Sequence, residues 1–134
     1  MIVFDTDIIG NLMKPAPSLA LIERLARTPV GDQATTAITV GELAYGAARA
    51  GRPELFERAV GLLRHLKVLT FDASSARRYG ELRAHLESVG RSLADADLRI
   101  AATVLAGGPD AILVTGNVRH FDRVPGLVVE NWMG

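Results

Sequence analysis

Short apolar runs alternate with stretches of helical spacing from one end of this 134-residue chain to the other. The apolar runs are IVF at 2–4, ATTAIT at 34–39, KVLTF at 67–71, AILVT at 111–115 and LVVEN at 127–131. Strands that alternate with helices are typical of a parallel sheet, because each parallel connection needs a crossover that is usually helical. We therefore expect an α/β fold: a three-layer sandwich with a mainly parallel central sheet flanked by helices.

Helix boundaries and turns complete this outline. Ser18 and Asp72 each precede a helical pattern and can cap it. Helices are expected at 19–26, 40–50, 54–66, 73–89 and 93–106. The segment VPGL at 124–127 has Pro second and Gly third, as in a type II turn. Because no repeat or linker interrupts the pattern, residues 1–134 are expected to form one domain.

Composition limits the partners and the compartment. The chain has 15 Lys and Arg against 15 Asp and Glu, so its formal net charge is zero. Contact with nucleic acid must therefore be local, since no overall positive field exists. With no cysteine, disulfides and thiolate zinc sites are excluded. No basic leader or long apolar stretch is present, so we expect a cytoplasmic chain that does not enter a membrane.

Four acidic residues are expected at one edge of the sheet. Asp5 follows the first apolar run, and Asp122 lies in the polar segment that follows 111–115. Glu42 and Asp97 lie near the starts of their helices. In a parallel sheet, the carboxyl ends of the strands and the starts of the following helices tend to share an edge, where ligands bind. The four carboxylates can therefore meet there.

Carboxylates that meet in this way call for a cation. Two unit charges about 4 Å apart cost roughly 4 kcal/mol at an effective dielectric constant of about 20. Because the chain has no cysteine and only three histidines, an oxygen-lined site for Mg²⁺ or Mn²⁺ is expected rather than zinc. Such an ion leaves positions open for water and phosphate oxygens, as phosphodiester hydrolysis requires.

Each acid also has a structural explanation. Asp5 can begin an Asx turn, and Asp122 can simply solvate its loop. Thr39 and Glu42 have the spacing of a capping box at the start of an apolar helix. From the residues alone, both kinds of role stay open for these acids.

A second capping pattern separates two neighbouring acids. Ser92 and Asp95 also have capping-box spacing, which gives Asp95 a structural role. Asp97 has no such role, although it lies one turn before Ala101 on the apolar face of its helix. Unpaired carboxylates are seldom buried, so Asp97 is expected at the rim of a site.

Four longer segments carry a family resemblance. VFDTDII, ITVGELAYGA, DLRIAATVL and LVTGNVRHFDRVPGLVVENW occur in the order and at the spacing that closely resemble VapC-type PIN-domain ribonucleases, the toxins of toxin–antitoxin pairs. The resemblance spans essentially the whole chain. It implies a PIN-like fold, RNA cleavage that depends on Mg²⁺, for which Mn²⁺ can substitute, and inhibition by a VapB-like antitoxin. The segment HFDRVPGL further resembles toxins that cleave initiator tRNA.

The resemblance also assigns positions. Asp5, Glu42 and Asp97 match the first, second and third acids of the family. For the fourth, close relatives have an acid directly after Phe, which is Asp122 here, whereas many PIN domains have Asp at the position of Asn117. The resemblance thus implies Asp5, Glu42, Asp97 and Asp122 as catalytic metal ligands, with Asn117 as the alternative oxygen donor, around one or two ions.

Four further residues are expected around these ligands. Thr115 matches a family position whose hydroxyl supports the site. Asp7 departs from the family, which usually has Asn there, so it either touches the metal or orients a water. Arg119 and His120 are close enough in sequence to contact the RNA backbone, although His120 can equally pack the loop.

Two other functions remain as alternatives. A PIN-like module can bind RNA or protein without cleaving, because a fold does not fix a function. The motif DTD after a strand is also found in haloacid dehalogenase-like phosphatases, which use the first Asp as a nucleophile. That family needs a Lys at a later strand end, and Lys67 instead precedes its strand.

A protein partner is expected at the N-terminal helices. An apolar groove there can accept a helix of the antitoxin. Its expected lining is Ile8, Ile9, Leu12, Met13, Leu21, Leu25, Tyr45 and Leu55. The resulting assembly is expected to be a homodimer or a toxin–antitoxin hetero-oligomer.

Overall fold

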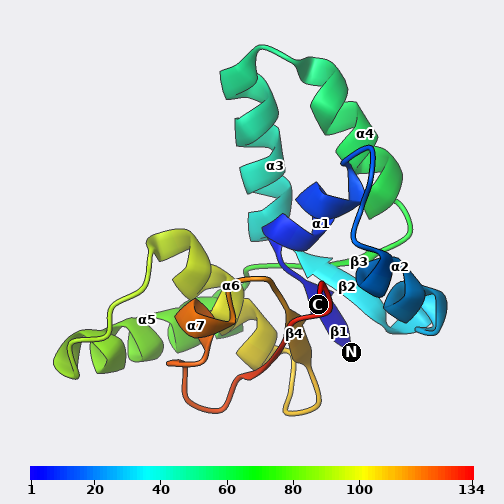
Figure 1. Cartoon of the computed structure of the whole chain (residues 1–134). Helices are drawn as coiled ribbons and strands as arrows, with labels where there is room; N and C mark the ends of the chain where they lie inside the picture. The colour runs from blue at the N-terminus through cyan, green and yellow to red at the C-terminus, as the bar shows by residue number, and fades with distance from the viewer.

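The computed structural model of the chain describes residues 1–134 and contains a five-stranded sheet (Figure 1). The strands are β1 (Ile2–Phe4), β2 (Gln33–Thr36), β3 (Lys67–Leu69), β4 (Ile112–Val114) and β5 (Val128–Glu130). They lie in the order β3-β2-β1-β4-β5, and every neighbouring pair is parallel. Helices flank this sheet, so the expected α/β fold with a parallel central sheet is confirmed.

Seven α-helices and one 3-10 helix connect the strands. They are α1 (Thr6–Leu12), α2 (Leu19–Ala26), the 3-10 helix Val30–Asp32, α3 (Ala37–Ala50), α4 (Pro53–Leu63), α5 (Ala73–Ser88), α6 (Asp95–Ala106) and α7 (Val118–Phe121). Figure 1 shows α3 and α4 as a hairpin that projects beyond the sheet, with α1 at its base. Helices α5 and α6 pack together on the other side.

The central strands contribute to two apolar cores, because successive side chains of a strand point to opposite faces. Val3 of β1 and Leu113 of β4 are fully buried in the core that contains α5, α6 and α7. Phe4 and Val114 are buried in the core that contains α1 and α2, where Ile8 packs. Strand β1 therefore lies between both layers, and the residue that follows it emerges at the carboxyl edge of the sheet.

Two predicted caps are confirmed, and one helix start was wrong. The Ser18 side chain accepts a hydrogen bond from the backbone N–H of Leu21, and Asp72 accepts one from Ser75. Helix α3 begins at Ala37 rather than at residue 40, because the hydroxyl of Thr36 accepts from the N–H of Thr39 and caps the helix there. The predicted strand at 34–39 accordingly ends at Thr36.

Two short helices were not predicted. Helix α1 spans Thr6–Leu12, and α7 spans only Val118–Phe121 within the segment expected to be a loop. Such short helices show too few turns for a clear hydrophobic period. The predicted turn at 124–127 is confirmed, since Gly126 has a φ of 78° as its third residue. None of the helices is both long and apolar enough to cross a bilayer.

Candidate active site

Asp5 and Thr115 form the buried floor of the site. The parallel register pairs Phe4 with Val114, so the residues that follow β1 and β4 lie side by side. The Thr115 hydroxyl donates a 2.8 Å hydrogen bond to Asp5 Oδ2, and the Thr6 N–H donates one of 2.8 Å to Oδ1. Asp5 therefore caps α1 and also presents a carboxylate at the sheet edge, where its side chain is only slightly exposed.

Burial makes the charge of Asp5 unfavourable. The pKa of its carboxyl is raised to about 6, chiefly by loss of solvation and also by the negative charges of Asp7 and Asp97. The hydrogen bonds from Thr115 and Thr6 act in the opposite direction but do not offset the burial. A nearby cation would remove this penalty.

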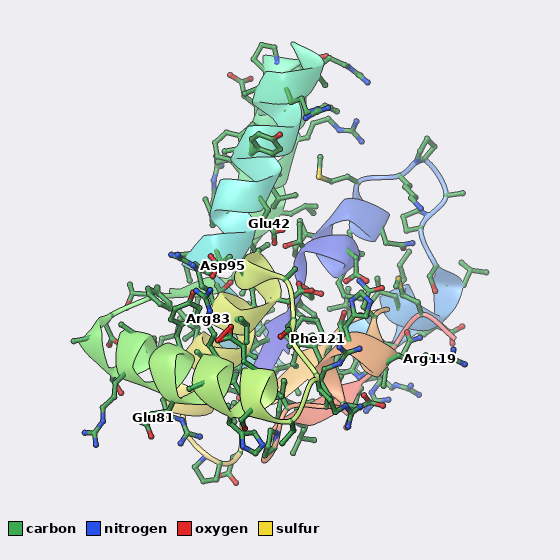
Figure 2. All side chains as sticks on the ribbon, turned by 90° about the vertical axis from the view of Figure 1, so that its left-hand side faces the viewer. Glu42, Glu81, Arg83, Asp95, Arg119 and Phe121 are labelled. Atoms are coloured by element: carbon green, nitrogen blue, oxygen red, sulfur yellow. The ribbon has the colours of Figure 1, made fainter.

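Glu42 is held by a residue that the sequence analysis missed. The Thr6 hydroxyl donates a 2.6 Å hydrogen bond to Glu42 Oε1 and lies 3.1 Å from the hydroxyl of Thr39. The predicted capping box of Thr39 and Glu42 is wrong, because Thr36 caps the helix and Glu42 lies a full turn too late. Figure 2 shows Glu42 at the end of α3 that meets α1 and α6. The only signal for Thr6 was its place between two acids in DTD.

Asp97 faces the other carboxylates from the first turn of α6. Its pKa is raised chiefly by burial, then by the charges of Glu42 and Asp7, whereas His120 lowers it. His120 Nδ1 lies 3.8 Å from Asp97 Oδ2, so the two pair when the imidazole is protonated. The expectation that Asp97 lies at the rim of a site is consistent with this half-buried position.

Asp95 points to different partners from those predicted. Ala94 begins α6 without any side-chain cap, so the capping box of Ser92 and Asp95 is wrong. Asp95 instead receives hydrogen bonds from Arg99, at 2.7 Å, and from the Tyr79 hydroxyl. It keeps a structural role, and Asp97 alone of the two is left for the site.

Asp7 lies among these carboxylates. Its Oδ2 accepts a 2.8 Å hydrogen bond from the Gly116 N–H, whereas its Oδ1 is buried without a hydrogen-bond partner. Its charge acts on both Asp5 and Asp97.

The two alternatives for the fourth ligand lie at opposite ends of α7. Asn117 precedes this short helix and Asp122 follows it, and both residues are exposed. Neither side chain makes a hydrogen bond with Asp5 or Asp97. Arg119 and His120 lie on the same helix and are exposed, with Arg119 directed outward in Figure 2.

The donor set suits a hard divalent cation. It consists of carboxylate and hydroxyl oxygens, two of its acids have raised pKa values, and one carboxylate oxygen is buried without a partner. As the side chains stand, however, no three His, Asp or Glu residues converge on a point at ligand distance. Sharing one ion therefore requires a side chain to move, and Asp97 allows this because it is partly exposed, whereas Glu42 is held by Thr6.

An apolar groove of about 400 Å³ adjoins the site between α1, α3 and α4. Met13 and Leu55, both predicted to contact a partner, line it together with Leu43. Glu42 lies at one end of the groove lining, so the groove and the acid site share this residue.

Most of the other predicted groove residues lie elsewhere. Ile8, Ile9 and Leu21 are fully buried, and Leu12 and Leu25 pack partly buried against the same core. Their side chains face the sheet because they form the apolar stripes of α1 and α2. Tyr45 is exposed but does not line the groove. The prediction was wrong for the fully buried Ile8, Ile9 and Leu21. Leu12, Leu25 and Tyr45 lie outside this groove, which is on the α3–α4 side.

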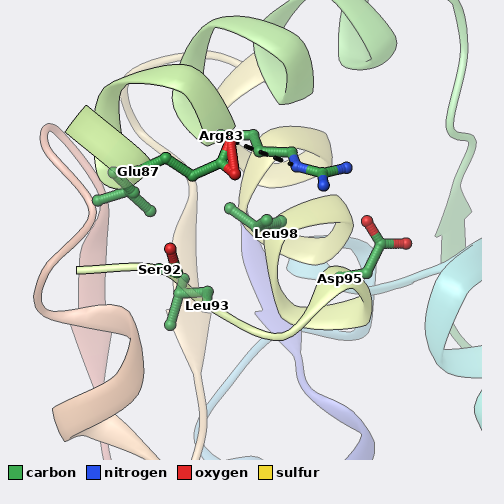
Figure 3. Close-up of a pocket in the computed structure, with 7 residues that line it drawn as sticks. Arg83, Glu87, Ser92, Leu93, Asp95 and Leu98 are labelled. Carbon is green, nitrogen blue, oxygen red and sulfur yellow. Dashed lines mark ion pairs between the residues drawn. The ribbon is translucent and has the colours of Figure 1, made fainter. Parts of the chain in front are cut away.

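A second hollow, of about 220 Å³, lies between α5 and α6 (Figure 3). Its lining is Arg83, Leu86, Glu87, Ser92, Leu93, Asp95 and Leu98. Figure 3 shows the ion pair between Arg83 and Glu87 across its wall. It shares no residue with the acid site, so it takes no part in the chemistry considered below.

The fold and this site agree with comparisons to known proteins. Residues 2–127 match the model of the PIN domain. Ribonuclease VapC2 of Haemophilus influenzae is 33% identical over 132 residues, which cover 98% of this chain and 97% of the relative. The tRNA(fMet)-specific endonuclease VapC of Shigella flexneri is 33% identical, with 97% and 96% covered.

Solved structures give the same result. VapBC2 from Rickettsia felis, bound to a DNA fragment from its promoter, contains a chain with a TM-score of 0.85 and 31% identity, covering 98% of this chain and 99% of that one. VapBC-1 from nontypeable Haemophilus influenzae contains a chain with a TM-score of 0.85 and 32% identity, and both chains are fully covered. The parallel sheet with its acidic edge is thus a PIN domain. Within that family, the chain belongs to the VapC-type ribonuclease toxins.

Proposed function

We propose that this chain is a Mg²⁺-dependent endoribonuclease, in which Asp5, Glu42, Asp97 and Asp122 hold one or two ions. Mn²⁺ can substitute, and Asn117 is the alternative to Asp122. The observation that carries the proposal is the buried Asp5, whose carboxyl has a pKa raised to about 6 beside other carboxylates. Raised carboxyl pKa values at a sheet edge favour a ligand-binding role over a structural one.

Some residues of the chain would bind the cation, and others orient those ligands. When bound, the cation would activate water and neutralise charge on the scissile phosphate. Thr115 and the Thr6 N–H fix the orientation of Asp5, and the Thr6 hydroxyl fixes that of Glu42. Fixed carboxylates lose little freedom on binding, which favours a preorganised site.

The substrate is proposed to be RNA, and tRNA in particular. The relative from Shigella flexneri is a tRNA(fMet)-specific endonuclease, at 33% identity along nearly the whole chain. Arg119 and His120 are exposed on α7, on the segment that follows Thr115, and can contact backbone phosphates. Because the chain has no net charge, basic side chains near the site have to supply the attraction for the RNA phosphates.

The partner is proposed to be a cognate VapB-like antitoxin. Similar chains have been solved in the VapBC complexes described above. The groove lined by Met13, Leu43 and Leu55 is apolar and open, as docking of an amphipathic helix requires. An antitoxin seated there would reach Glu42 and could cover the acid site. The assembly would be a toxin–antitoxin hetero-oligomer or a homodimer.

A haloacid dehalogenase-like phosphatase is not favoured by the structure. That chemistry needs a Lys near the first Asp, at the carboxyl edge of the sheet. Lys67 begins β3 and is exposed at the amino end of an outer strand, whereas Asp5 follows the carboxyl end of the central strand β1.

Sequencing of RNA ends tests the proposal in cells. After brief induction of the wild-type chain, new ends are expected at a few positions, in tRNA first. Asp97→Asn at equal abundance should produce none of them, because it lacks one carboxylate of the site. Identical ends from both proteins would contradict this function.

A further inference from the structure

Asp7 has one oxygen that the structure explains and one that it does not. Oδ2 accepts the Gly116 N–H at 2.8 Å, which ties the first turn of α1 to the segment after β4. Oδ1 is inaccessible to solvent and has no hydrogen-bond partner. A buried carboxylate oxygen without a partner is costly, so such an atom in a folded protein calls for an explanation.

The backbone at Gly116 approaches the Asp7 carboxylate closely. A Cβ atom added at Gly116 would lie 2.7 Å from Asp7 Oδ2 and 2.7 Å from the terminal methyl carbon of Met133. Only glycine therefore lets the backbone come this close to the carboxylate. The hydrogen bond from Gly116 and this close approach fix the place of Oδ2, and Oδ1 is left buried without a partner.

Asp7 also lies close enough to two proposed ligands for its negative charge to raise their pKa values. Its negative charge acts on both Asp5 and Asp97, which come from different elements of the fold. Asp7 thus lies close enough to Asp5 and to Asp97 for its carboxylate to belong to the same site.

From this placement we propose that Asp7 is itself a ligand of the divalent cation, through Oδ1, while Gly116 holds Oδ2. This inference rests on the metal site of the proposed function and adds one carboxylate to it. The competing explanation is that Asp7 only braces the backbone at Gly116.

Asp7→Asn separates the two explanations. The Asn carbonyl oxygen can still accept the Gly116 N–H, and the NH₂ group then takes the place of Oδ1. The hydrogen bond from Gly116 is kept, but the carboxylate oxygen proposed to bind the cation is lost. Mg²⁺ binding to the full chain, measured by titration calorimetry, should weaken by about tenfold or more. Asp110→Asn is the matched control, because Asp110 is exposed in the loop before β4, at the opposite edge of the sheet.

A second variant covers the case in which Asp7→Asn does not fold. Gly116→Ala keeps every acid but forces a Cβ against Asp7 Oδ2, so the carboxylate must move. Like Asp7→Asn, it should weaken Mg²⁺ binding, and its circular dichroism spectrum should be unchanged. Wild-type affinity in a folded Asp7→Asn protein would overturn the proposal for Asp7 and leave the metal site intact. If the wild type binds no Mg²⁺, the metal site and the role of Asp7 are both refuted.

Discussion

Thr6 Oγ1 donates a 2.6 Å hydrogen bond to Glu42 Oε1, and this bond joins the start of α1 to α3 at the acid site. The two residues are 36 positions apart in the sequence. Because Thr6 directly follows Asp5, the same turn that positions one carboxylate also orients another. Hydrogen bonds to a carboxylate are short and strong, so this contact fixes the Glu42 side chain.

Thr6→Val should reduce activity without unfolding the chain. Valine has the shape of threonine but cannot donate to Glu42, so the carboxylate loses its fixed orientation. Loss of such a supporting contact typically costs about 10- to 100-fold in metal affinity or activity. RNA cleavage rates of the purified variant measure the effect. Thr6→Ser keeps a donor hydroxyl and should retain most of the wild-type activity. Equal rates for the valine variant and the wild type would show that Thr6 does not position Glu42.

The metal-free chain should lose stability as the pH rises. The pKa of Asp5 is about 6 in the folded chain, above its ordinary value of 3.8, so the folded state holds this proton more tightly. The associated stability is complete below about pH 4 and lost as the pH passes about 6. Its size is about 3 kcal/mol, from the shift in pKa.

Asp5→Asn isolates this effect. In urea unfolding with a chelator present, the wild type should lose up to about 3 kcal/mol more than the variant between about pH 4 and pH 7. Parallel pH profiles would contradict the raised pKa of Asp5.

Magnesium should stabilise the chain without any substrate. At a free concentration of about 100 times its dissociation constant, the ion would add about 2.7 kcal/mol to the free energy of unfolding. Asp97→Asn should reduce this gain and raise the melting temperature of the metal-free chain, because one of several repelling charges is gone. Differential scanning calorimetry with and without Mg²⁺ measures both changes. If the melting temperature of the wild type is the same with and without Mg²⁺, the chain has no cation site.

The groove between α1, α3 and α4 should be needed for the partner but not for catalysis. Leu55→Asp places a charge in its apolar lining, so capture of the co-expressed antitoxin should fall at least about tenfold, while RNA cleavage continues. Leu19→Asp is the control, since Leu19 is 76% exposed on α2, away from the groove. Equal capture by Leu55→Asp and the wild type would place the partner on another surface.

The sequence predicted the fold better than the contacts within the site. Alternating apolar runs and helices predicted that Asp5 and the segment from Thr115 to Asp122 follow the ends of two strands and can meet. The register of β1 and β4 shows that Asp5 and Thr115 lie side by side. The capping box at Thr39 and Glu42 failed because Thr36, also able to cap, lies one turn earlier. Local spacing cannot distinguish two caps when strand and helix propensities overlap.

The sequence indicated a supporting role for Thr115, but two other supporting contacts could not be predicted from it. The bond from Thr6 to Glu42 and the bond from Gly116 to Asp7 both join residues far apart in the chain. They depend on how α1 docks against α3 and against the segment after β4, which only the packed structure defines. The ends of α7 show the same limit, because the resemblance implies Asp122 as the fourth ligand and Asn117 remains the alternative.

Cleavage of tRNA by Glu42→Gln, compared with the wild type, tests the central claim most directly. Glu42 caps no helix, and Gln can still accept from the Thr6 hydroxyl, so the substitution removes little besides a negative charge. We predict that the wild type cleaves with Mg²⁺, stops in excess chelator and recovers when Mg²⁺ is restored. Glu42→Gln should be slower by at least about 100-fold, with an unchanged circular dichroism spectrum. Cleavage at the wild-type rate by a folded Glu42→Gln protein, or in chelator by the wild type, would contradict a carboxylate-held cation as the centre of this enzyme.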